Sequence, residues 1–89
     1  PDAMTKAQCL ARLGNIPEAV RVTGEALRRS PGDPLVQLQA ATVYSLAGDT
    51  TNALNNIKAA IDRGIQKRWF KGSAFHQLVK NPQFQSLTR

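Results

Sequence analysis

A period of 34 residues constrains the fold of this chain more than any other feature of its sequence. Four small residues recur at that distance: Ala7, Gly14, Ala19 and Ala26 return as Ala41, Gly48, Ala53 and Ala60. Self-similarity at a period of roughly 20–50 residues is typical of repeat proteins. Small residues recur where neighbouring helix backbones must come close. The pattern therefore predicts a scaffold that presents a surface, rather than a fold built around a catalytic pocket.

Helical spacing and helix-ending residues predict two helices in the first unit. Gly14 ends the first helix, because glycine accepts the left-handed conformation that is common just after a helix. Asn15 is expected to cap the second helix, which has Pro17 in its first turn. The expected apolar faces are Ala3, Met4, Ala7, Leu10 and Ala11 in the first helix and Ala19, Val20, Thr23, Ala26 and Leu27 in the second.

The second unit repeats this plan after a helix-breaking stretch at residues 30–34. Asp33 is expected to cap the third helix, with Pro34 as its first residue, and Gly48 to end it. Asp49 is expected to cap the fourth helix, whose apolar positions copy those of the second. Four helices joined by such short turns are expected to pack as antiparallel neighbours.

These residues resemble the tetratricopeptide repeat, a helix–turn–helix unit of about 34 residues. The resemblance spans residues 1–65. The signature positions are filled by Ala7, Leu10, Gly14, Ala19, Ala26 and Pro31 in the first unit, and by Ala41, Tyr44, Gly48, Ala53, Ile57 and Ala60 in the second. The resemblance implies an all-α fold, in which antiparallel helix-turn-helix repeats at 1–33 and 34–65 stack as a short right-handed α-solenoid.

Residues 66–89 leave the 34-residue period and are aromatic and basic. Ser73 and Asn81 are plausible helix caps, the latter followed by Pro82, so two short helices are expected here. Two stacked repeats leave an open apolar face that needs a further unit or a cap. The tail is expected to be that C-terminal helical cap. It is loosely similar to tails that follow such repeats in bacterial multidomain proteins, including serine/threonine kinases and transcriptional regulators.

No residue pattern of an active site occurs in the chain, so we do not expect an enzyme. Glycine-rich phosphate loops, HExxH and serine nucleophile elbows are absent from the sequence. His76 is the only histidine, and Cys9, expected to be a small buried hydrophobe, is the only cysteine. The scattered acidic residues form no carboxylate pair. Neither a catalytic site nor a metal or cofactor site is predicted.

Bulk properties suggest an origin in a larger intracellular protein. The chain has 89 residues and starts without Met, so it is interpreted as one domain of a longer protein. A single cysteine suits a reducing compartment such as the cytoplasm. No apolar run approaches the ~18 residues that span a bilayer.

The resemblance implies a function in protein recognition, on the concave face that is lined by the first helix of each unit. The candidate residues of this peptide-binding face are Met4, Gln8, Ala11, Arg12, Leu35, Leu38, Thr42, Ser45 and Leu46. Family members that bind a terminal carboxylate use Lys and Asn at such positions. This chain has neither residue type there. A mostly apolar groove favours an amphipathic helix or an extended apolar segment of another protein.

Two other functions stay open. Arg63, Lys67, Arg68 and Lys71 flank Trp69 and Phe70, and together could grip nucleic-acid phosphates while an aromatic ring stacks on a base. Alternatively, Trp69 and Phe70 are buried anchors of the cap and the charges form a solvated rim. The chain could also self-associate through its uncapped amino-terminal face.

Overall fold

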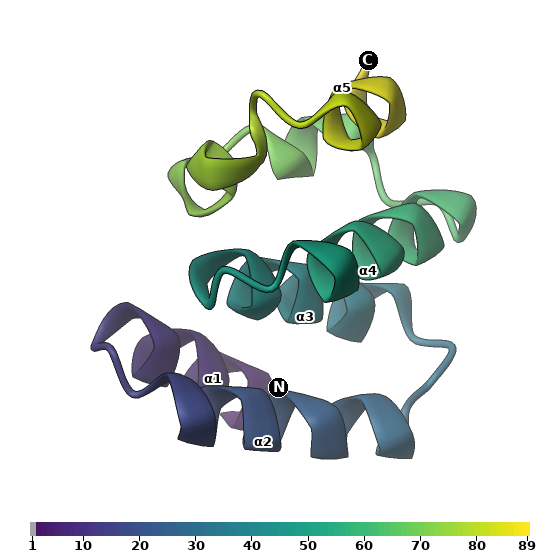
Figure 1. Cartoon of the computed structure of the whole chain (residues 1–89). Helices are drawn as coiled ribbons and strands as arrows, with labels where there is room; N and C mark the ends of the chain where they lie inside the picture. Colours follow the sequence, from purple (N-terminus) through teal and green to yellow (C-terminus); the bar gives the residue numbers. More distant parts are fainter. Residues whose placement is uncertain (1) are drawn as a thin grey trace.

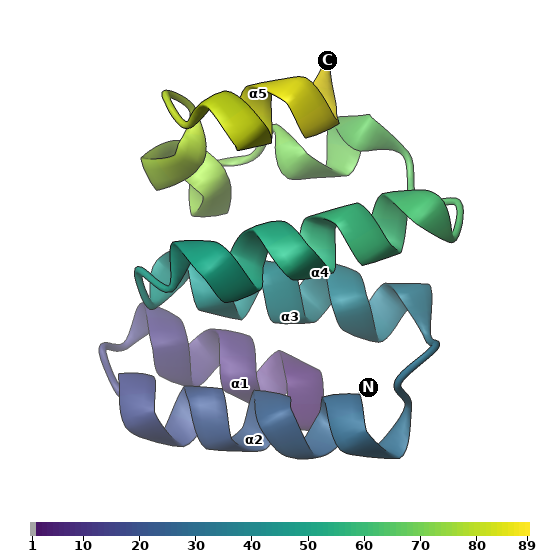
Figure 2. The same cartoon turned by 45° about the vertical axis from the view of Figure 1, so that its right-hand side comes forward.

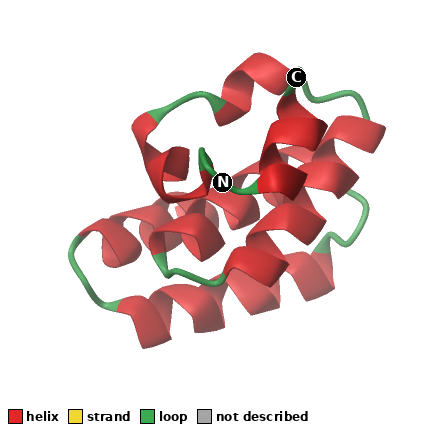
Figure 3. Cartoon of the chain, turned by 45° about the horizontal axis from the view of Figure 1, so that its top comes forward, coloured by secondary structure: helices red, strands yellow, loops and turns green. Residues whose placement is uncertain are grey.

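The computed structural model describes residues 2–89, and describes side-chain surroundings from Lys6 onward. Within that range every element is helical (Figure 3). The order along the chain is α1 (Asp2–Arg12), α2 (Ile16–Arg29), α3 (Pro34–Leu46), α4 (Thr50–Asp62), the 3-10 helices η1 (Lys67–Phe70) and η2 (Ser73–Leu78), and α5 (Pro82–Thr88). The all-α prediction is confirmed.

The elements form three layers (Figure 1). α1 packs against α2, and α3 packs against α4. α3 also contacts both α1 and α2, so the two pairs lie one on the other. The third layer consists of η1, η2 and α5, with η2 against α3 and α5 against α4 (Figure 2). The C-terminal segment therefore covers the second helix pair, on the side opposite the first pair.

The same type of turn connects the two helices of each pair. Gly14 and Gly48, which are 34 residues apart, have left-handed φ angles of 89° and 79°. Gly14 N–H donates to the Ala11 carbonyl, and the next N–H donates to the Leu10 carbonyl. At Gly48 the corresponding bonds go to the carbonyls of Ser45 and Tyr44. Each pair of bonds satisfies carbonyls that the helix end leaves free.

Side-chain caps start three of the helices as predicted. The carboxylates of Asp33 and Asp49 accept hydrogen bonds from the N–H groups of Leu35 and Asn52, at 2.9 and 3.2 Å. The Asn81 side chain accepts from two N–H groups at the start of α5. Such oxygens satisfy donors that have no partner within the helix.

Two predicted caps were wrong in detail. Asn15 stands at the N-cap position of α2, but its side chain makes no capping hydrogen bond. Ser73 is the first residue of η2 rather than its cap, and Gly72 precedes it in an extended conformation. The tail also contains η1, in addition to the two short helices that were expected.

Two of the three recurring alanine pairs occupy equivalent places in the core. Ala7 and Ala41 are fully buried, and so are Ala19 and Ala53. The third pair differs, since Ala60 is fully buried while Ala26 is only partly buried. Ala60 belongs to α4, which α5 contacts, whereas α2 lies in an outer layer. The difference between Ala26 and Ala60 is in line with the contact that α5 makes with α4.

All three phenylalanines of the chain lie in the C-terminal segment. Phe70, Phe75 and Phe84 are buried. The rings of Phe70 and Phe75 meet edge to face with centroids 5.4 Å apart, and Phe75 and Phe84 stack at 6.4 Å. Aromatic pairs in these geometries add stability beyond the area they bury. This cluster holds together a segment that has little regular α-helix.

Candidate interaction surfaces

The predicted peptide-binding residues lie on α1 and α3, two helices that pack against each other. Five of them reach the surface to some extent. Arg12 is exposed, Leu35 is 62% exposed, and Gln8, Leu38 and Leu46 are partly buried. Met4 lies outside the residues whose side chains are described. The accessible part of this face is therefore mostly apolar, with Arg12 as its charged group.

Three of the predicted face residues are buried instead: Ala11, Thr42 and Ser45. Ser45 is only 1% exposed, and its hydroxyl donates to the Ala74 carbonyl of η2 at 2.7 Å. Thr42 bonds the Leu38 carbonyl one helical turn back. The prediction of an accessible Ser45 is thus wrong, because the C-terminal segment lies on this part of α3.

The four basic residues of the second predicted surface have different surroundings. Arg63 is exposed at the end of α4. Lys67 and Lys71 donate to the carbonyls of Arg89 and Thr88, at 2.9 and 2.8 Å. These two amines lie at the carbonyl end of α5, where a helix favours positive charge. Arg68 lies over the neighbouring Trp69 ring, 5.8 Å from its centroid.

The two adjacent aromatic residues separate in the structure. Phe70 is fully buried and belongs to the aromatic cluster, as the anchor interpretation predicts. Trp69 is 57% exposed, so it is not a buried anchor of the cap. Because consecutive residues of a short helix point in different directions, only one of these two rings can face the core.

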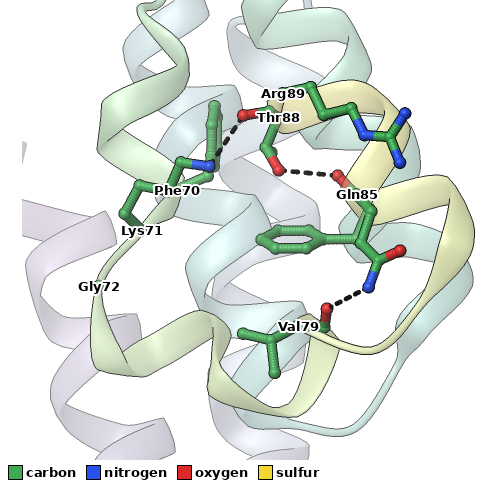
Figure 4. Close-up of a pocket in the computed structure, with 8 residues that line it drawn as sticks. Phe70, Lys71, Gly72, Val79, Gln85, Thr88 and Arg89 are labelled. Carbon is green, nitrogen blue, oxygen red and sulfur yellow. Dashed lines mark hydrogen bonds between the residues drawn. The ribbon is translucent and has the colours of Figure 1, made fainter.

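A pocket of about 480 Å³ lies between the η1–η2 connection and α5 (Figure 4). Its walls are tied together by Lys71, and by Gln85, whose side-chain amide donates to the Val79 carbonyl at 2.9 Å. The lining residues are Phe70, Lys71, Gly72, Val79, Phe84, Gln85, Thr88 and Arg89. No pattern in the sequence predicted this pocket, because it depends on how η1 and α5 meet. A second hollow, of about 390 Å³, lies between α4 and α5 around Leu54 and Leu87.

The acidic residues and the cysteine are distributed over several helices and turns. Among the side chains described, the ion pairs join Arg21 to Glu18 and Glu25, and Lys58 to Asp62. Hydrogen bonding to Arg21 lowers the pKa of Glu18. Cys9 is exposed, so its prediction as a buried hydrophobe is wrong. In the described part of the chain, no three His, Cys, Asp or Glu residues gather as metal ligands would.

Comparison with known proteins returned no match among family models, curated proteins or solved structures. Of the helices described, none has both the length and the apolar character needed to cross a membrane.

Proposed function

We propose that this chain is a tetratricopeptide-type module that binds a peptide or helix of another protein. The observation that carries the proposal is that helix ends recur at the period of the sequence. α1 and α3 end at Arg12 and Leu46, and α2 and α4 begin at Ile16 and Thr50, with the same glycine turn between the helices of each pair. A helix–turn–helix unit that repeats its turn at the period of its sequence is expected of a repeat protein. In this interpretation units 1–33 and 34–65 stack with a right-handed twist, and residues 66–89 cap them.

The proposed binding face is the accessible part of α1 and α3. Leu35, Leu38 and Leu46 offer apolar area along α3, and Gln8 and Arg12 add polar contacts from α1. Leu35 in particular is more exposed than a core leucine would be. An apolar stripe with polar neighbours suits the apolar face of an amphipathic helix, which the partner would bury on binding.

Leu35 and Thr51 offer a matched pair of variants for testing this face. Each is the exposed second residue of its helix, Leu35 in α3 and Thr51 in α4. A glutamate near a helix N-terminus interacts favourably with the helix dipole, so neither substitution should weaken the fold. Leu35→Glu would place a charge in the proposed groove, whereas Thr51→Glu would place one outside it.

The experiment selects peptides from a random display library against the immobilised chain and measures their affinity in solution. Leu35→Glu is expected to weaken binding about tenfold, as for a central apolar contact, and Thr51→Glu to leave it unchanged. Amide chemical shifts should change on α1 and α3. Selected peptides that bind Leu35→Glu as tightly as the original chain, or that shift only α4 and α5, would contradict the proposal.

A further inference from the structure

The net charge of the chain comes from residues 63–89. Residues 63–89 contain six Lys and Arg residues and no Asp or Glu. Residues 1–62 contain six of each kind, so their formal charges cancel and the net charge of +6 belongs to the last 27 residues. A segment with one sign of charge attracts polyanions over longer distances than a mixed surface does.

Part of this charge flanks one exposed aromatic ring along the chain. Lys67, Arg68 and Lys71 come from η1 and the residue after it, as does Trp69. Trp69 is 57% exposed, although burying such a ring would contribute much more to stability than exposing it. The aromatic cluster formed by the three phenylalanines already fills the interior of this segment. The fold therefore gives Trp69 little part in the core.

The positions of these groups are restrained before any ligand binds. The hydrogen bonds of Lys67 and Lys71 to the end of α5 fix two amines beside each other, since they reach the carbonyls of successive residues. Each ammonium group keeps further N–H donors for a ligand, because it has three. The Arg68 guanidinium lies over the Trp69 ring, 5.8 Å from its centroid. Such restraints lower the entropy that binding must overcome.

We propose that this surface, formed by Arg63, Lys67, Arg68, Trp69 and Lys71, binds single-stranded nucleic acid. Cationic side chains contact the phosphates, and one base stacks on the exposed Trp69 ring. This function goes beyond the protein binding proposed above and uses a different face, so either proposal can fail alone.

The structure favours a nucleic acid over an anionic membrane as the ligand. A membrane-binding helix needs a continuous apolar face. Here the three phenylalanines are buried, and the exposed large apolar residues of the segment are Trp69 and Val79, which η2 separates along the chain. An isolated aromatic ring between cations matches a chain of alternating bases and phosphates more closely.

The proposal is tested with a labelled oligothymidylate of about ten nucleotides, a length within the usual site size of small single-strand binders. Fluorescence anisotropy measures its affinity for the 89-residue chain at several salt concentrations. With three or four phosphates neutralised, affinity should fall by about 20- to 50-fold between roughly 50 and 200 mM salt. Because Trp69 is the only tryptophan, its fluorescence should be quenched by the stacked base.

Variants distinguish the effects of ring stacking and of charge on binding from a loss of folding. Trp69→Ala should weaken binding about tenfold, the size expected for one stacked base. Arg63→Gln combined with Arg68→Gln should lower both the affinity and its salt dependence, and leaves the lysines that hold α5 in place. Arg28→Gln combined with Arg29→Gln removes the same charge from the exposed end of α2 and should have no effect. Circular dichroism checks that each variant is folded.

Three results would overturn the proposal. The first is no binding of the oligonucleotide at low salt. The second is equal binding of polyglutamate or polyphosphate, with Trp69→Ala having no effect, which would indicate a surface that does not read bases. The third is a blue shift of Trp69 fluorescence with phosphatidylserine vesicles and no quenching by the oligonucleotide, which would assign the surface to membranes.

Discussion

Alanine substitution at Gly24 and at Gly48 is expected to change the stability of this chain in opposite directions. Gly24 lies in the middle of α2, where an added Cβ would meet only the Arg28 side chain at an ordinary distance of 3.7 Å. We expect Gly24→Ala to raise the free energy of unfolding by about 0.5–1 kcal/mol, because alanine restricts the unfolded chain and favours the helix. Gly48→Ala, at a φ of 79°, should instead lower it by about 1 kcal/mol. Urea denaturation measures both changes, and a destabilised Gly24→Ala chain would show a constraint at α2 that its packing does not reveal.

Tyr44 makes stability depend on pH in the alkaline range. Burial raises the pKa of its phenol, and the nearby Asp49 carboxylate raises it further. The unfolded chain ionises Tyr44 near its ordinary pKa of about 10 and the folded chain only at higher pH. The contribution of protonated Tyr44 to the free energy of unfolding is therefore complete below pH ~10. It is lost as the pH rises through the pKa that Tyr44 has in the folded chain. Since Tyr44 is the only tyrosine, the near-ultraviolet absorbance of tyrosinate reports it directly.

Asp49→Asn is the control for this titration. Asparagine keeps the capping oxygen at the start of α4 but removes the charge, so the pKa of Tyr44 should fall part of the way towards its ordinary value. If Tyr44 had the same pKa in the folded chain and in the chain unfolded by denaturant, the pH dependence expected from it would be ruled out.

Helix starts were predictable from sequence where one short-range rule was enough. Asp33, Asp49 and Asn81 cap their helices because an acceptor stands next to free N–H groups, and that arrangement is local. Asn15 has the same opportunity but does not use it. Lys67–Phe70 gave no helical period, being only four residues long, so η1 was missed. Ser45 was misjudged and Trp69 was left open for a related reason: their surroundings depend on where the C-terminal segment lies.

The contact between α3 and η2 has one buried hydrogen bond at its centre, from Ser45 to the Ala74 carbonyl. Ser45→Ala should lower the free energy of unfolding by about 1–3 kcal/mol, because the buried carbonyl would lose its partner. Ser86→Ala, which changes an exposed serine of α5 in the same way, should change stability by less than about 0.5 kcal/mol. Thermal melts followed by circular dichroism compare the two, and equal effects would mean that the Ser45 bond contributes nothing net.

Over the complete chain, the sequence predicted the number of layers better than their composition. The 34-residue recurrence indicated two helix pairs, and the need to cover an open apolar face indicated a third element. It indicated the alanines that pack the first two layers, but it left open which aromatic residues would pack the third. Alanine permits close helices but buries little area per residue, so the aromatic layer must contribute a large share of the apolar burial.

A chain that ends at Ile65 tests this division directly. Without residues 66–89, the side of α3 and α4 that η2 and α5 cover would face water, including Ser45 and Leu54. The remaining two helix pairs would have no aromatic cluster, and two repeats alone rarely bury enough surface to fold. We expect the shortened chain to melt at a lower temperature and over a broader range than the full chain, as seen by circular dichroism. Phe75→Leu in the full chain, which keeps the layer but loosens its cluster, should fall between the two. A shortened chain that melts at the same midpoint and as sharply would show that the alanine-packed pairs are stable by themselves, and the third layer would then be free to serve binding alone.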